Sequence, residues 1–130
     1  MAFAAAVTAR LGTLLLLAAP ALAAPVVDKP LSAPASAEQF VQVCATRLAL
    51  TDAQRSSLRE YLEQEMNYLA VQRANHTAAE VAELLPAQRE EFRKVTDRLM
   101  SPSQLVRFRE LEATPKMQEY LRQMDLAKAK

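Results

Sequence analysis

Leu50-Thr51-Asp52-Ala53-Gln54-Arg55 is the stretch of this 130-residue chain that decides the fold, because it encodes a helix start. The Thr51 hydroxyl can accept a hydrogen bond from the backbone N–H of Gln54, and the Gln54 side chain can accept one from the N–H of Thr51. The two residues therefore predict a capping box and a long helix over residues 52–74. We expect Thr51→Ala to cost about 1 kcal/mol of stability, and Gln54→Ala to cost less.

The pattern returns 50 residues later as Met100-Ser101-Pro102-Ser103-Gln104. Ser101 is the expected cap, Pro102 suits the first helical position, and Gln104 again stands three residues beyond the cap. A degenerate third copy, Leu84-Leu85-Pro86-Ala87-Gln88, lacks the capping hydroxyl. The repeats predict helical hairpins built twice over, and they predict no chemistry.

At these stretches the chain resembles the LTXXQ-motif family of small bacterial periplasmic proteins, which includes Spy and CpxP. Residues 50–54 fit the motif outright, and residues 100–104 fit it with Met for Leu and Ser for Thr. The resemblance spans roughly residues 36–124. It implies an all-helical, cradle-shaped protein, often a dimer, that binds unfolded clients or a sensor protein under envelope stress. The motif residues are Leu50, Thr51, Gln54, Met100, Ser101 and Gln104.

Residues 1–23 are typical of a secretory signal peptide, with Arg10 before an apolar run and small residues at cleavage spacing. The run is short for a membrane span. We therefore expect cleavage near Ala23, a periplasmic location and no stable membrane insertion. Residues 24–35, rich in Pro and Ala, are expected to be a disordered leader. Residues 36–130 are expected to form a single helical domain.

The composition favours helices and argues against several functions. The chain has one Gly and no Trp, and it is rich in Ala, Leu, Glu, Gln and Arg. Basic and acidic residues nearly balance without a basic cluster, which argues against nucleic acid as the partner. The sequence contains no Gly-rich phosphate loop and no CxxC, so we expect neither an enzyme nor a cofactor. His76 is the sole histidine, and no second ligand near it in sequence suggests a metal site.

The spacing of apolar residues predicts an all-α fold with four to five helices. Ser36 is the expected cap of the first helix, with Gln39 completing a capping box. Beyond Thr77, which forms a capping box with Glu80, the apolar stripe keeps its phase across Pro86. We therefore expect one bent helix over residues 78–100, although a break at Leu85 is the alternative. Two short helices should follow, one after Ser101 and one starting at Pro115.

Four residues on apolar faces leave alternatives open. Cys44 is either a buried thiol, which we favour, or part of an intermolecular disulfide. Glu65 projects into the apolar stripe, where we favour pairing with an arginine of a neighbouring helix over an acid/base role. Tyr61 and Tyr68 either pack at the rim or belong to a surface offered to clients.

Three functions remain compatible with the sequence. The chain could be an ATP-independent periplasmic holdase whose homodimer binds unfolded envelope proteins. It could instead be a regulatory ligand that inhibits a sensor kinase through its periplasmic domain, or a structural helical protein of the envelope. Long arginine side chains offer both an apolar stem and a charge. The candidates for client binding are Tyr61, Tyr68 and Leu69 for the apolar part and Arg55, Arg59, Arg73, Arg89 and Arg93 for the charged part.

Overall fold

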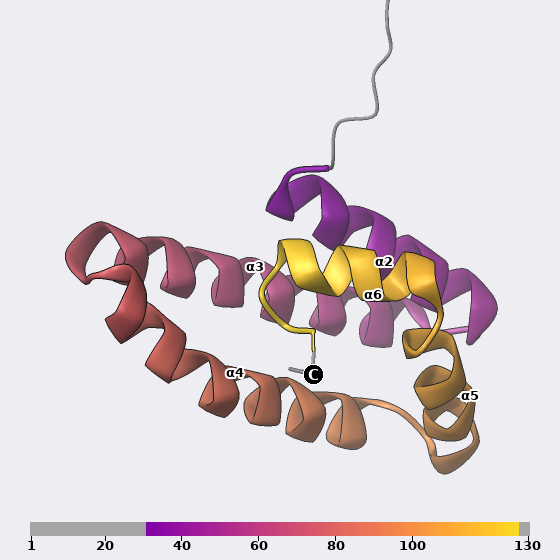
Figure 1. Ribbon diagram of the computed structural model, residues 1–130. Helices are drawn as coiled ribbons and strands as arrows, with labels where there is room; N and C mark the ends of the chain where they lie inside the picture. The colour runs from indigo at the N-terminus through magenta and orange to yellow at the C-terminus, as the bar shows by residue number, and fades with distance from the viewer. Residues whose placement is uncertain (1–30, 128–130) are drawn as a thin grey trace, which may run out of the picture. The chain divides into compact units, whose positions relative to one another are not determined.

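The computed structural model describes residues 31–127, which form five α-helices and no strand. The predicted all-α class is therefore confirmed. The predicted signal peptide and residues 24–30 of the predicted leader lie outside the described residues. The helices are α2 (Ala33–Arg47), α3 (Asp52–Asn75), α4 (Ala78–Leu99), α5 (Pro102–Glu112) and α6 (Pro115–Gln123) (Figure 1).

Three of the four predicted capping boxes start α3, α4 and α5. Thr51, Thr77 and Ser101 each accept a hydrogen bond from the third residue of their helix, and the side chain of that residue accepts one in return. α4 runs through Pro86 as one helix, so the prediction of a single helix is confirmed. The degenerate third copy of the motif, residues 84–88, lies inside α4 and begins no helix.

The start of α2 differs from the prediction. Ser32 caps this helix, because its hydroxyl accepts a hydrogen bond from the backbone N–H of Ala35 at 3.2 Å. Pro34 lies in the first turn, where its missing N–H leaves no bond unmade. Ser36, the predicted cap, is instead fully buried within the helix, and its hydroxyl has no hydrogen-bond partner among residues 31–127. The cap predicted at Ser36 is therefore wrong, and residues 33–35 belong to the helix.

The core lies where α2 packs against α3 and α6 and where α5 meets α6 (Figure 1). Its aromatic centre joins three helices: the ring of Phe40 lies 6.2 Å from that of Phe108, nearly perpendicular to it, and 6.1 Å from that of Phe92. Such tilted pairs are favourable beyond the area that they bury. Cys44 is buried beside them as a free thiol, and burial raises its pKa to about 12. The predicted buried thiol is confirmed.

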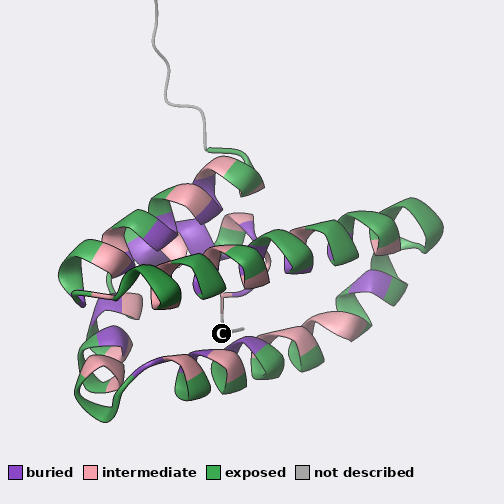
Figure 2. Ribbon diagram, turned by 180° about the vertical axis from the view of Figure 1, so that it is seen from behind, coloured by how far each residue is buried: buried purple, intermediate pink, exposed green. Residues whose placement is uncertain are grey.

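α4 is the long helix with the least burial. Of its 22 residues, only Val81, Phe92 and Thr96 are buried (Figure 2). The other apolar residues of its stripe, which are Leu84, Leu85, Val95 and Leu99, remain half-buried. Since α4 packs mainly against α3, part of its apolar face is left available for contact.

Candidate functional site

The two motif glutamines meet in space, although they lie 50 residues apart in sequence. The Gln54 amide nitrogen donates to the side-chain oxygen of Gln104 at 2.8 Å, and the Gln104 amide nitrogen donates back to Gln54 at 3.2 Å. Each side-chain oxygen also accepts a hydrogen bond from the backbone N–H of its own cap, Thr51 or Ser101, at 2.9 Å. The two capping boxes are therefore joined into one network.

The same two glutamines also satisfy backbone carbonyls at the ends of other helices. Gln54 donates to the carbonyl of Leu99 at 2.9 Å, and Gln104 donates to the carbonyl of Leu48 at 3.3 Å. The last carbonyls of a helix have no partner within it and need one elsewhere. Leu50 and Met100, the first residues of the two motifs, pack into or against the core. The motif residues thus hold helix ends together, and this geometry gives them a structural role.

The apolar candidates for client binding differ in access. Tyr61 packs against the core with its ring stacked on Phe92 at 6.2 Å, and its buried hydroxyl has no hydrogen-bond partner in the described part of the chain. Burial and the nearby Glu65 raise the pKa of Tyr61. Leu69 is buried, whereas Tyr68 is 39% exposed. Of these three side chains, Tyr68 is the one that a client could reach without rearrangement.

Glu65 does not pair with an arginine, so that prediction is wrong. Its side chain is buried in α3, and no cation among residues 31–127 lies within 4.0 Å of its carboxylate. The Gln88 amide, with its nitrogen turned toward Glu65, donates to the two carboxylate oxygens at 2.7 and 2.8 Å. Burial and the charge of Glu91 raise the pKa of Glu65. A neutral amide thus takes the place of the expected guanidinium.

The five candidate arginines do not gather on one face. Arg55 pairs with Asp52 at 3.1 Å, and Arg59 binds Glu38 of α2 through two of its nitrogens. Arg73 lies near the end of α3, where it pairs with Asp125. Arg89 and Arg93 line one pocket together with Arg109 of α5. The structure therefore separates the charged candidates into three places.

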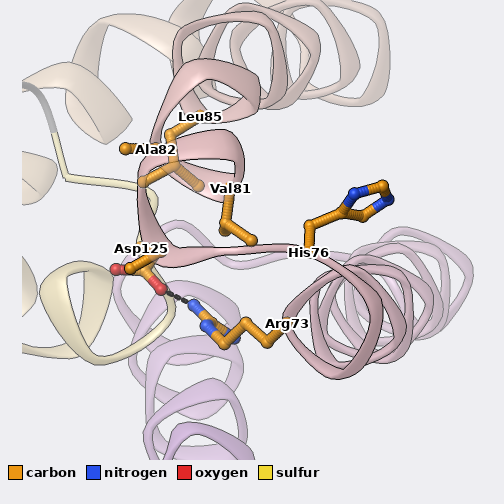
Figure 3. Close-up of a pocket in the computed structure, with 7 residues that line it drawn as sticks. Arg73, His76, Val81, Ala82, Leu85 and Asp125 are labelled. Carbon is orange, nitrogen blue, oxygen red and sulfur yellow. Dashed lines mark ion pairs between the residues drawn. The ribbon is translucent and has the colours of Figure 1, made fainter.

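A pocket of about 360 Å³ lies at the far end of α3 and α4, and we call it the distal pocket (Figure 3). Its apolar wall comes from α4, through Ala78, Val81, Ala82 and Leu85. Its polar rim consists of the ion pair of Arg73 with Asp125 and of His76. Figure 3 shows that the His76 ring is turned away from this ion pair.

A second pocket of about 230 Å³ shares Arg73 with the distal pocket. Its lining is mostly apolar and includes Met66 and Leu69 of α3, Pro34 of α2 and Met124, which follows α6. Apolar lining with a few polar groups at the rim is the usual composition of sites that bind organic ligands and apolar side chains. The two pockets therefore place apolar surface on both sides of Arg73, which the sequence named only as a charged candidate.

Two further properties of the described residues bear on function. Within residues 31–127, no group of three or more His, Cys, Asp or Glu side chains is arranged to hold a metal ion. None of the helices described there is both long enough and apolar enough to cross a bilayer.

No family model matches the chain, and no curated protein or solved structure matches it either. The likeness to the LTXXQ-motif family rests on the motif residues alone.

Proposed function

We propose that this chain is an exported, ATP-independent chaperone of the holdase type, which binds unfolded envelope proteins in the periplasm. The observation that carries the proposal is the distal pocket, an apolar recess with a charged rim at the end of two long helices. Unfolded chains expose apolar side chains beside polar backbone, and such a recess suits both parts. The capping motifs and their likeness to the LTXXQ-motif family support the same function.

The charges of the distal pocket favour broad client binding over selection of one sequence. Arg73 and Asp125 neutralise each other, so the rim presents no net charge that would repel acidic or basic segments. The apolar wall accepts side chains by burial, which has no directional requirement. A site of this kind binds many clients weakly and releases them without nucleotide hydrolysis.

The half-buried side of α4 extends this surface beyond the pocket. Leu84 and Val95 lie along the stripe and are only partly covered. In the proposed assembly, α3 and α4 form a helical hairpin, and two copies of the chain combine into a cradle-like homodimer with this surface on its concave side. Several weak contacts along one client would then add to a useful affinity.

Suppression of aggregation tests the proposal. A chemically unfolded model client is diluted with and without the purified protein, light scattering is followed, and the molar mass of the protein is measured in parallel. We expect suppression at near-stoichiometric ratios. No suppression would refute the holdase function, and capture of one defined envelope partner would then indicate a regulatory ligand.

A pair of matched variants locates the binding surface. Ala82 is exposed and lines the distal pocket, whereas Ala87 is exposed on the same helix and lines none of the pockets described above. Ala82→Trp should fill the pocket and weaken suppression by up to about tenfold, since burial of one Leu-sized group is worth about 1.5 kcal/mol. Ala87→Trp should leave suppression unchanged. Equal effects of both variants would remove the distal pocket from the proposal.

A further inference from the structure

A pocket of about 240 Å³ between α4 and α5 contains three arginines and is separate from the distal pocket. We call it the arginine pocket. Arg89 and Arg93 come from α4, and Arg109 comes from α5. The rest of the lining consists of an apolar wall and two carboxylates: Pro86, Phe92, Leu126, Glu90 and Glu112.

Two of the three guanidinium groups are already neutralised by carboxylates. Arg93 pairs with Glu90 and, at 2.9 Å, with Asp97. Arg109 pairs with the same Asp97 at 2.7 Å and with Glu112 at 3.1 Å. These ion pairs fix both side chains in the wall of the pocket. Neither is free to take a ligand without giving up a partner.

Arg89 differs, because no ion pair or side-chain hydrogen bond joins it to any other residue in the range 31–127. Its Nε atom is buried and has no partner there. A guanidinium carries five N–H donors in a planar fork that matches the two oxygens of a carboxylate. The two terminal nitrogens of Arg89 are not among the buried unpaired atoms, so they are the donors that a carboxylate in the pocket would meet.

The apolar wall restricts which carboxylate suits the pocket. Phe92 and Leu126 are almost fully buried and offer only a small apolar surface beside Arg89. A volume of about 240 Å³ holds one residue-sized group and is small for a cofactor. A terminal apolar residue carries its carboxylate directly beside its side chain. An internal Asp or Glu brings the carboxylate with continuing backbone on both sides.

We propose that the arginine pocket binds the free C-terminal carboxylate of a peptide that ends in an apolar residue, with Arg89 holding the carboxylate and Phe92 and Leu126 contacting the side chain. This inference rests on the proposed chaperone function, because it adds a preference for exposed chain ends to the binding of unfolded clients. Arg93 and Arg109 share three carboxylates, so Arg89 brings the local charge to zero. The selectivity therefore comes from the geometry of the Arg89 fork and not from a net positive charge.

Fluorescence anisotropy with three labelled peptides tests the proposal on the purified protein. The first peptide is Ser-Gly-Ser-Ala-Ala-Leu with a free carboxylate, the second is its C-terminal amide, and the third is an amide with an internal Glu. We expect the free acid to bind about tenfold or more tightly than either amide, as a charge-assisted bidentate pair requires. This comparison needs no variant and therefore does not depend on the folding of one.

Substitutions then assign the preference to Arg89. Arg89→Gln should abolish the preference for the acid, and Arg89→Lys should keep part of it because the charge remains without the fork. The matched control is Arg98→Gln, since Arg98 is exposed on the same helix and outside the pocket. The control should keep the full preference. Thermal melts followed by circular dichroism confirm that each variant is folded.

Three results would overturn the proposal: equal binding of acid and amide, equal binding of the internal-Glu peptide, or an equal loss in Arg98→Gln. Its failure is distinguishable from failure of the chaperone function. Suppressed aggregation without a preference for the acid removes only the role of the arginine pocket. A preference for the acid without suppressed aggregation removes only the holdase function.

Discussion

Gln54→Ala should destabilise this protein more than Thr51→Ala, which reverses the order expected from the motif alone. Thr51 loses one capping bond, to the Gln54 N–H at 3.0 Å, and typically about 1 kcal/mol with it. Gln54 loses three interactions: with the Thr51 N–H, with the Leu99 carbonyl and with the side chain of Gln104. At about 0.5–1.5 kcal/mol for each net hydrogen bond, the cost is about 1.5–4.5 kcal/mol.

Urea unfolding followed by circular dichroism measures these costs. Gln64→Ala is the matched control, because Gln64 is exposed on the same helix, and its variant should stay within about 0.5 kcal/mol of the parent. In a double-mutant cycle, Gln54→Ala and Gln104→Ala should show a coupling of about 1 kcal/mol, since the two amides bond to each other. A cost of Gln54→Ala below that of Thr51→Ala, or no coupling, would refute the role of the amide pair.

Three further predictions concern the burial of individual side chains. Glu65→Gln should gain stability relative to the parent as the pH rises, because burial and Glu91 raise the folded-state pKa of Glu65 above its ordinary 4.5. The bonds that Gln88 donates to the carboxylate act in the opposite direction and reduce this gain. In the parent protein, Glu65 contributes most to stability below pH 4.5, and this contribution is lost as the pH rises and the carboxyl ionises. The stability of the variant relative to the parent, measured by thermal melts, should therefore grow from pH 4 to pH 7. A difference that stays constant over this range would contradict the reasoning. The Cys44 thiol, buried and with its pKa raised to about 12, should react with a thiol reagent only when the protein unfolds, and rapid labelling of the folded protein would disprove its burial. Tyr61→Ala should lower the free energy of unfolding by about 3 kcal/mol, whereas Tyr68→Ala should lower it by less than about 1 kcal/mol. The reason is that the Tyr61 ring packs against the core and the Tyr68 ring is exposed. Similar losses for the two variants in urea unfolding would contradict this difference.

The parts of the fold that depend on local chemistry could be predicted from the sequence. Thr51, Thr77 and Ser101 start helices where predicted, because a capping box involves residues only three apart. α4 continues through Pro86 because the apolar stripe keeps its phase there. The start of α2 was missed because Ser32 and Ser36 can both cap, and only the burial of Ser36 decides between them.

The parts that depend on the packing of one helix against another could not be predicted. Glu65 meets Gln88, and the next residue along α4 is Arg89. Successive residues on a helix differ by about 100° in direction, so the rotation of α4 decides which of the two faces Glu65. The same rotation places Arg89 in the arginine pocket, where it has no carboxylate partner among the described residues. Sequence gave no signal for that rotation, and the interior position of Glu65 was the one indication that some polar partner was needed.

The lengths of α3 and α4 explain why two copies of the motif are useful at this separation. The helices have 24 and 22 residues, which correspond to about 36 and 33 Å. Because these lengths nearly match, the end of α4 at Leu99 returns to Gln54 at the start of α3, and α5 begins within reach of the same amide. A single motif would cap one helix, whereas the second copy turns the cap into a contact across 50 residues. Arg73 lies 19 residues beyond Gln54 on α3, so the distal pocket is about 28 Å from the amide pair. Since no shared side chain links the two places, the motif should set the stability of the fold while the pockets set what it binds.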